Sequence, residues 1–518
     1  MKSYKAFLFL ILVPCLSLTS CYHEFAGGGG GGGVGGGGGG GGATTANVSL
    51  TMVSDTLPAN IGIISFRVSI SSIVLTSSTG TTSTLNTGNL IVDLARAQSD
   101  SIYLGTIAGV PTGTNSSISV QLTGGEIAFY NGTGAALTSP VCPAGAICVA
   151  PFNANGVPVI TSSLPITANT GFGIDFNLAN ALTVTGTTLN INLTNSGTAN
   201  VLSSFALPRN TDLAAGQLDL IEDFTGVATV TGTSVSVVSQ PAAGRGTITA
   251  SSSSNTVYDQ DPTQTLCPTG TATLSGCITT TNEAASMDAI LNSDGTFTVQ
   301  EIEPLLSSPI LDTVEGTVFS IDPNLQTQFE MVVSDIIPAT TSSKIGSLSM
   351  GDPLTVNLGT GPAFWVDSKG LPMLNSAPAS YDTFFNQTNT TALHLGQVVA
   401  VHVNSFTAAN GTTPAIANSV DTVTLRWSRF IAPVAAGSSP GLFDTSGLPG
   451  YFNLNPATIA GVQVFLGTQG QDGVTNLDGI ANSSTPAATP SLGVRALYLE
   501  DTGFTLNPPF FAAKVRQH

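Results

Sequence analysis

Apolar and polar residues alternate along most of this chain, and the alternation predicts β-strands. In Ile64–Ser71 apolar residues occupy every second position, with serine or arginine between them. Residues 118–122 and 189–193 repeat this pattern. A period of two with one polar face is typical of half-buried antiparallel strands. Asp93–Ser101 is the one stretch that reads as a helical fragment, and it is short.

Turn residues separate the expected strands and group them into modules. Clusters such as Ser78–Gly80 and Asn131–Gly132 supply the glycine, asparagine and serine that tight turns require. Many short strands between such turns favour a β-sandwich. We therefore predict an all-β protein that has an N-terminal antiparallel β-sandwich over residues 47–212.

The remaining sequence carries weak internal repetition. Residues 224–240 resemble residues 314–335, with Gly226 and Gly316 at matching positions. A second element, a glycine followed by alternating strand residues, recurs at Gly351, Gly396 and Gly493. Recurring strand-and-turn units indicate repeated small modules. We expect two or three β-barrel-like modules after the sandwich, at residues 218–310, 311–415 and 416–518.

Composition agrees with this picture and narrows the range of partners. Apolar residues make up 42% of the 518 residues, whereas charged residues make up only 8%. Serine, threonine and asparagine fill the polar positions, which suits β-sheet surfaces better than solvated helices. The net charge of −18, without a basic cluster, argues against nucleic acid as a partner because phosphate contacts need lysine and arginine.

The N-terminus has the features of a secretory signal. Two lysines in Met1–Lys5 precede the apolar run Ala6–Val13, which is too short to span a bilayer. The sequence Leu18–Cys21 (LTSC) resembles the bacterial lipobox. The resemblance implies that residues 1–20 are a signal peptide, cleaved between Ser20 and Cys21, and that Cys21 carries palmitate-type acyl chains. An ordinary signal peptide with a chance cysteine is the alternative.

The residues after Cys21 predict a tether. Residues 21–46 are mainly glycine, which has no side chain to bury and loses the most entropy on ordering. A disordered segment of this length has a root-mean-square reach of ~28 Å. We therefore expect a lipoprotein anchored in the outer membrane, with its head on the periplasmic face or the cell surface. The membrane is the expected partner, and the oligomeric state is left open.

The cysteines also favour an oxidising compartment. Four cysteines lie outside the N-terminal segment, in two local pairs: Cys142 with Cys148, and Cys267 with Cys277. Even numbers of closely spaced cysteines in a secreted chain predict disulfides. Proximity favours the two local bonds, although four cysteines allow three pairings. A shared zinc site is the alternative, but these spacings fit zinc knuckles poorly.

Two stretches of the chain resemble known families. The segments ISFRVSISSIVLTSS, LIVDLARAQSDSIYLGTIAGVPTGTNSSISVQL and FGIDFNLANALTVTG follow the order of features in the DUF4382 family of bacterial lipoproteins, a domain of unknown function. The later pattern of G-x-V, strand, acidic turn, strand and G-D/Q-x-V-x-V is similar to the small β-barrel repeats of the DUF5666 family. The resemblances imply a fold and a cell address, and they carry over no active site. The insert around Cys142 and Cys148 departs from the DUF4382 spacing.

The sequence offers only weak candidates for catalysis. Residues 437–441 (GSSPG) match the G-x-S-x-G pattern of hydrolases, but proline and glycine follow the serine where that motif needs a helix. Residues 501–503 (DTG) match aspartic proteases, but no second copy is present and a phenylalanine follows. We assign no catalytic residues and predict that the protein is not an enzyme, with a hydrolase as the third hypothesis.

Candidates for metal and ligand binding are also few. His394 and His402 would share a face of an unbroken strand, and oxygen-rich turns at residues 258–261 and 472–479 could hold a structural calcium. We interpret the histidines as strand residues and the turns as turn formers, and expect no metal or other cofactor.

Exposed tryptophans would support recognition of a glycan. Trp365 and Trp427 are the only two in the chain, and Arg426 precedes the second. Aromatic residues in strands usually lie in a core instead. The sequence thus favours a non-enzymatic structural or recognition role in the cell envelope, with a surface adhesin that binds a glycan or a protein as the alternative.

Overall fold

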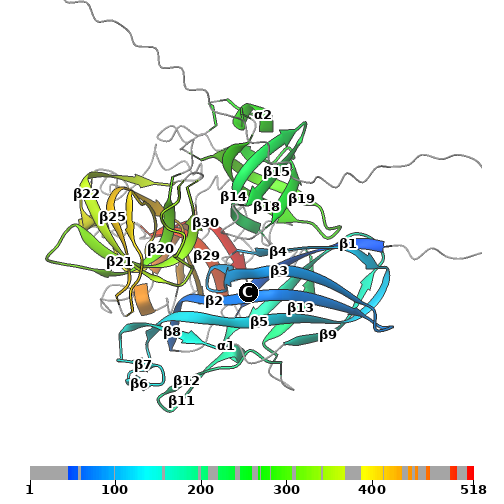
Figure 1. Cartoon of the computed structure of the whole chain (residues 1–518), viewed down its shortest axis with the longest axis horizontal. Helices are drawn as coiled ribbons and strands as arrows, with labels where there is room; N and C mark the ends of the chain where they lie inside the picture. The colour runs from blue at the N-terminus through cyan, green and yellow to red at the C-terminus, as the bar shows by residue number, and fades with distance from the viewer. Residues whose placement is uncertain are drawn as a thin grey trace, which may run out of the picture. The chain divides into compact units, whose positions relative to one another are not determined.

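The structure is a computed structural model, and its regular elements are almost all β-strands, as predicted (Figure 1). It describes residues 45–55, 60–98, 100–153, 158–195, 200–207, 220–239, 246–258, 267–268, 270–280, 282–305, 311–339, 342–367, 387–411, 413–433, 442–445, 450–452, 462–466, 491–498 and 510–517. Thr44–His518 forms one compact unit. None of the helices in the described residues has the length and apolar character needed to span a lipid bilayer.

Two sheets form the predicted sandwich. The strand order of the first is β13-β10-β1-β4, and that of the second is β3-β2-β5-β8, with β9 also pairing with β5. Their bounds are β1 (Thr45–Asp55), β2 (Ile61–Ser77), β3 (Thr82–Asp93), β4 (Ile102–Pro111), β5 (Gly113–Asn131), β8 (Ile147–Phe152), β9 (Val159–Ile166), β10 (Thr170–Asn177) and β13 (Leu202–Ala206). Apolar residues from both sheets meet in one core, among them Leu50, Phe66 and Val120.

One strand pair of the sandwich differs from the antiparallel prediction. Strands β1 and β10 pair in parallel, from Val48 opposite Thr170 to Asp55 opposite Asn177. They are far apart in the chain, so no tight hairpin forces them to be antiparallel. Short elements complete the module: β6 (Leu137–Thr138), β7 (Val141–Cys142), α1 (Leu178–Ala181), β11 (Leu182–Thr185) and β12 (Thr188–Ile191). The expected helical fragment forms only the 3-10 turn η1 (Arg96–Gln98).

The next module is a closed five-stranded barrel. Its strands are β14 (Leu220–Thr231), β15 (Ser234–Ser239), β16 (Thr247–Ser251), β18 (Glu283–Leu291) and β19 (Phe297–Pro304). The parallel pairing of β16 with β19 closes the barrel, since β14 pairs with both β15 and β18. The short β17 (Val257–Tyr258) lies beside β19, and α2 (Leu274–Cys277) precedes β18. Five-stranded Greek-key barrels of this kind include the OB-fold.

The second barrel repeats the strand order of the first. It consists of β20 (Thr313–Ile321), β21 (Gln328–Ile337), β22 (Pro353–Val366), β23 (Val398–His402) and β25 (Ala415–Arg426), with β24 (Ser405–Thr407) beside β25. The parallel pairing of β22 with β25 closes it. The boundary expected between residues 415 and 416 falls at the start of β25, which pairs with β22 and β23, so the barrel continues to Arg426.

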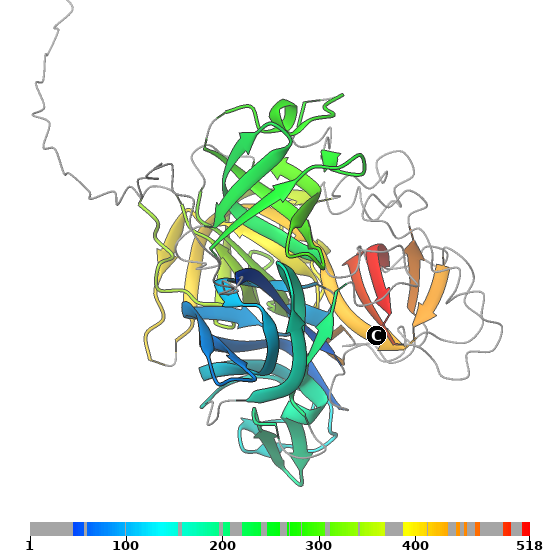
Figure 2. The same ribbon diagram turned by 90° about the vertical axis from the view of Figure 1, so that its right-hand side faces the viewer.

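The C-terminal strands follow the same path. Strand β26 (Ser428–Pro433) pairs with β29 (Ser491–Tyr498), and β29 pairs with β30 (Phe510–Gln517). Strand β30 pairs in parallel with β28 (Val462–Leu466), which pairs with β27 (Leu442–Thr445). In the order of the chain these are strands one, four, five, three and two, the same path as in both closed barrels. Figure 2 shows them in orange to red. The third predicted module therefore follows the strand path of the two barrels, but in the described residues no pairing of β26 with β27 closes its sheet.

The two glycines that mark the sequence repeat are required for the same structural reason. Gly226 lies on the first strand of the first barrel, and an added Cβ would lie 2.1 Å from the carbonyl oxygen of Val238 on the second strand. Gly316 lies on the first strand of the second barrel, where a Cβ would lie 2.5 Å from the carbonyl oxygen of Val332. Both contacts exclude a side chain, so glycine lets the first and second strands approach closely.

Candidate functional site

The disulfides are as predicted from the spacing of the cysteines. Cys142 at the end of β7 is bonded to Cys148 in β8, and Cys267 is bonded to Cys277 at the end of α2. Both bonds are local crosslinks within a module. Ser20 and Cys21, the expected cleavage and lipidation residues, lie outside the described residues.

The two tryptophans are not a matched pair of exposed rings. Trp427 is only 1% exposed and packs into the core of the second barrel, and Arg495 lies over its ring at 5.7 Å from the centroid. Its ring is therefore not available for stacking on a sugar. Trp365 in β22 is partly buried.

The histidines do not share a strand. His402 ends β23, whereas His394 precedes it and packs near the ring of Tyr498 at 5.9 Å between centroids. The Nδ1 atom of His402 lies 2.7 Å from the carboxylate of Asp421. No group of three or more metal-ligating side chains is found in the described part of the chain.

The remaining sequence motifs cannot be placed. Residues 437–441, 472–479 and 501–503, which gave the hydrolase, calcium and aspartic protease candidates, lie outside the described residues. The same holds for residues 259–261 of the other oxygen-rich turn, of which only Tyr258 is described.

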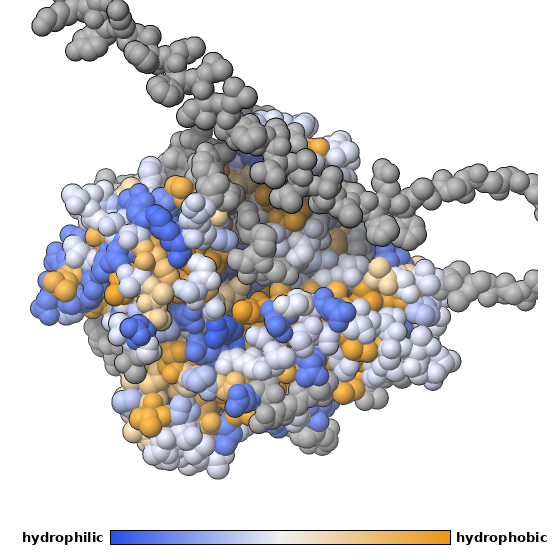
Figure 3. Space-filling view, viewed as in Figure 1, coloured by the Kyte–Doolittle hydropathy of each residue, from blue (hydrophilic) through white to orange (hydrophobic). Residues whose placement is uncertain are grey.

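The most distinctive polar feature is a buried group of arginines and carboxylates where the four modules meet. We call it the junction cluster: Arg96, Asp100, Glu222, Asp223, Asp288, Glu315, Asp335, Asp367, Arg426, Arg429 and Arg495. The chain has only 13 lysines and arginines, so four of them in one cluster is a strong concentration of positive charge. Figure 3 shows hydrophilic residues in several separate places on one face, among pale and hydrophobic ones.

Each module contributes to the junction cluster. The sandwich supplies Arg96 and Asp100 from η1 and the residues after it, and the first barrel supplies only carboxylates. The second barrel supplies three carboxylates and Arg426. The third supplies Arg429 from β26 and Arg495 from β29. Positive and negative groups therefore pair between modules, not only within them.

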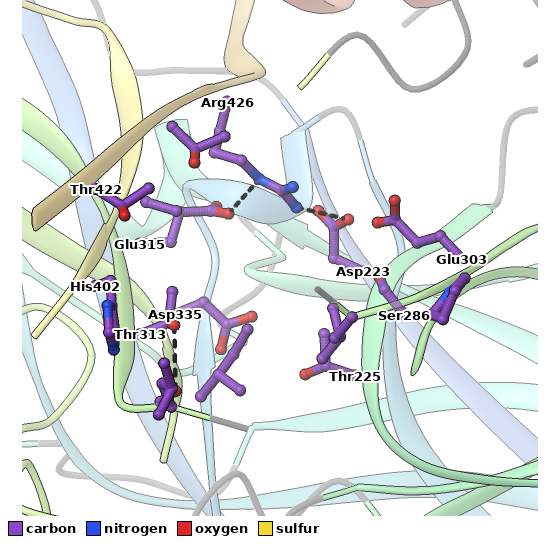
Figure 4. Close-up of a pocket in the computed structure, with 16 residues that line it drawn as sticks. Asp223, Thr225, Ser286, Glu303, Thr313, Glu315, Asp335, His402, Thr422 and Arg426 are labelled. Atoms are coloured by element: carbon purple, nitrogen blue, oxygen red, sulfur yellow. Dashed lines mark hydrogen bonds and ion pairs between the residues drawn. The ribbon is translucent and has the colours of Figure 1, made fainter. Parts of the chain in front are cut away.

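Asp223 is the centre of the cluster. Its carboxylate lies 3.0 Å from Arg96, 3.1 Å from Arg426, 3.2 Å from Arg429 and 3.7 Å from Arg495. It thus contacts an arginine from each of the other three modules. Figure 4 shows the Arg426 guanidinium between the carboxylates of Asp223 and Glu315.

A β-bulge places Asp223 at this position. The pairing of β14 with β18 runs from Ile221 opposite Ala289 to Phe224 opposite Met287, so two residues of β14 face one of β18. Asp223 has a φ of 49°, in the left-handed region that aspartate tolerates better than most residues. Its backbone N–H donates to the Asp288 carboxylate at 2.7 Å. Bulges commonly redirect side chains at functional positions.

The remaining arginines complete the contacts between modules. Arg495 is fully buried and lies 2.8 Å from Glu222 and 3.6 Å from Asp288 of the first barrel. Arg429 lies 2.5 Å from Asp100 of the sandwich. Arg426 also pairs with Asp367, which follows β22. Charges buried in this way are tolerated when each is paired and hydrogen-bonded.

The arginines lower the pKa of one buried carboxylic acid of the cluster, Glu315. Burial alone would raise the pKa of Glu315, but Arg96, Arg426 and Arg429 more than offset it, so the pKa lies below its usual value of 4.5. Burial alone would lower the pKa of Arg495, and Glu222, Asp223 and Asp288 instead raise it well above its ordinary value. The lowered pKa of Glu315 and the raised pKa of Arg495 each favour the charged form of the side chain, as expected for groups held in ion pairs.

A pocket adjoins the junction cluster between the first two barrels (Figure 4). Its volume is about 250 Å³, and Asp223, Glu315 and Arg426 of the cluster form part of its wall. Sequence reasoning missed both the cluster and the pocket. The available signal was the acidic pair Glu222–Asp223 within an apolar strand and the two arginines Arg426 and Arg429, three positions apart, which a purely hydrophobic pattern does not require.

Comparisons with known proteins add no assignment. No protein-family model matches this sequence, and no curated protein matches it either.

Proposed function

We propose that this protein is a lipid-anchored lipoprotein of the cell envelope with a non-enzymatic structural or recognition role. The observation that carries the proposal is Cys21, preceded by a lipobox-like sequence and followed by the glycine-rich stretch. The compact unit begins at Thr44, directly after that stretch. Two or three acyl chains on one cysteine would give stable anchoring, where one chain would be marginal. The outer membrane is the proposed location.

The pairing of the charged side chains between modules supports a non-enzymatic role. Catalytic acids and bases need access to a substrate. In this chain most charged groups of the junction cluster are held in ion pairs between modules, and Asp223, Glu315 and Arg426, which also line the adjoining pocket, are themselves in such pairs. Their arrangement fits a function in which four modules are held as one body at the end of a tether.

The family resemblances belong to the same proposal. A sandwich followed by small barrels has the order of modules that a DUF4382-like domain and DUF5666-like repeats would give. The VDL segment (residues 92–94), which belongs to the DUF4382 resemblance, holds a turn in place. The Asp93 carboxylate accepts hydrogen bonds from the backbone N–H groups of Phe66 and Ala95, which fixes the turn that carries Arg96.

A metabolic labelling experiment tests the anchor. Cells expressing the full chain would be grown with an alkyne analogue of palmitate, and the membranes would then be separated by density. We expect label on the wild-type protein in the outer-membrane fraction and none on Cys21→Ser. Cys15→Ser, which changes the other N-terminal cysteine, is the matched control and should keep the label. Label that persists on Cys21→Ser would overturn the proposal.

A further inference from the structure

The pocket beside the junction cluster is built from the outer faces of two barrels. Thr313 and Glu315 of β20 face it, whereas Val314 between them lies in the core of the second barrel. Strand β25 alternates in the same way, with Thr424 and Arg426 in the wall. Alternate residues of a strand point to opposite faces. The sequence of each strand therefore separates a core face from a pocket face.

The electrostatics of the pocket favour a positively charged ligand. Four carboxylates line it, those of Asp223, Glu303, Glu315 and Asp335, and Arg426 is the one arginine among its lining residues. Excess negative charge in a buried region is costly, and a cation nearby lowers that cost.

A buried hydroxyl group in the wall points to a ligand independently. Ser286 of β18 is 2% exposed and lines the pocket, and its Oγ has no hydrogen-bond partner among the described residues. Buried polar groups of proteins nearly always have a partner, so an unpartnered one in a pocket wall calls for an explanation. A donor group on a ligand would satisfy this oxygen.

The rest of the wall limits the kind of cation. Leu305, Leu311, Ile337 and Ala400 give the pocket an apolar side. Hard metal ions prefer a shell of oxygen ligands, whereas an alkyl chain gains from contact with apolar side chains. The volume of about 250 Å³ suits a small molecule or one side chain.

We propose that this pocket binds a primary ammonium group on a short apolar stem, which both a free alkylamine and a lysine side chain present. The ammonium would lie between Glu303 and the Oγ of Ser286, where it can donate to both, and the stem would lie against the leucines. The proposal does not depend on the lipid anchor, so the two can fail separately.

Titration calorimetry on the full chain in detergent tests the proposal. The probes are n-butylamine, 1-butanol, butyrate and the tripeptide Gly-Lys-Gly at neutral pH. We expect saturable binding of one n-butylamine per chain and no saturable binding of the neutral or anionic analogue. Binding of Gly-Lys-Gly with equal or higher affinity would identify a lysine side chain as the source, and its absence would identify a free amine.

Two variants and one control link binding to the pocket. Ser286→Ala and Glu303→Gln should each weaken n-butylamine binding by about tenfold, the effect of losing one hydrogen bond to a charged group. Ser286→Ala removes a hydroxyl that has no partner among the described residues, so its thermal midpoint should stay unchanged. Ser234→Ala in β15, outside the pocket, should bind like the wild type. Equal affinity in all variants, or saturable binding of 1-butanol, would overturn the proposal.

Discussion

The barrel interiors and the junction cluster are both buried, but opposite kinds of side chain build them. The core of the second barrel consists of residues such as Val314, Val399 and Leu425, whereas the cluster consists of arginines and carboxylates. Apolar packing is non-directional and tolerates exchange of similar residues. Ion pairs need partners at defined places. The difference indicates that apolar cores form each module and that the cluster specifies how the modules join.

Apolar contacts also join the modules, so the junction cluster shares this role with apolar side chains. Phe430, Tyr498 and Phe510 of the third module pack in one group with Ile64 and Ala128 of the sandwich. This contact contributes affinity between the two modules but little directional preference. Removing the cluster should therefore weaken the joined state without exposing the module cores.

The largest expected effect comes from breaking the centre of the cluster. Asp223→Asn leaves four arginines without their shared partner, and loss of one member of a buried ion pair costs ~3–5 kcal/mol. Urea denaturation of residues 44–518 should show a loss of that size. Asp421→Asn is the matched control, since its half-exposed pair with His402 should contribute at most ~1 kcal/mol. Similar losses for both variants would contradict a special role for Asp223.

A substitution in a barrel core should change unfolding in a different way from one in the junction cluster. Leu425→Ala in β25 removes a fully buried side chain from the second barrel and should cost ~2–5 kcal/mol. The side chain faces the interior of the barrel and not the junction, so the modules should stay coupled. Scanning calorimetry should therefore show one transition, as in the wild type, at a lower temperature. Two or more transitions in this variant would contradict the assignment of the coupling to the junction cluster.

Lowering the pH should have the smallest effect on the free energy of unfolding, and it should act through the ion pairs of the junction cluster. The pKa of Glu315 is lowered in the folded protein, so its contribution is fully present above its usual pKa of 4.5 and is lost as the pH falls through the lowered value. The difference in unfolding free energy between wild type and Glu315→Gln should be largest at neutral pH and shrink in acid. Urea denaturation at a series of pH values measures it, and a constant difference would contradict this assignment.

Much of the fold follows from local sequence pattern. Alternation in Ile64–Ser71 predicted a strand that does form, and the repeat around Gly226 and Gly316 identified equivalent first strands of two barrels. The parallel pairing of β1 with β10 was missed because pairing direction depends on a connection of more than one hundred residues. The start of the third module was placed too early because β25 has the same alternation as any other strand.

The junction cluster could not be predicted, because its partners are far apart in the chain. Arg96 and Asp335 are separated by 239 residues, and Arg429 and Asp100 by 329. Local pattern shows that a charge lies in a strand, but it does not show which charge lies opposite. Trp427 shows the reverse problem: its neighbour Arg426 suggested an exposed binding surface, whereas the ring is in the core and the arginine faces the junction.

Scanning calorimetry of residues 44–518 with and without Asp223→Asn tests the central claim most directly. If the junction cluster couples the modules, the wild type should unfold in one transition, and the variant should unfold in two or more, with the earliest at a lower temperature. A variant that retains a single transition at the wild-type temperature would show that the apolar contacts alone hold the modules together, and would contradict this account.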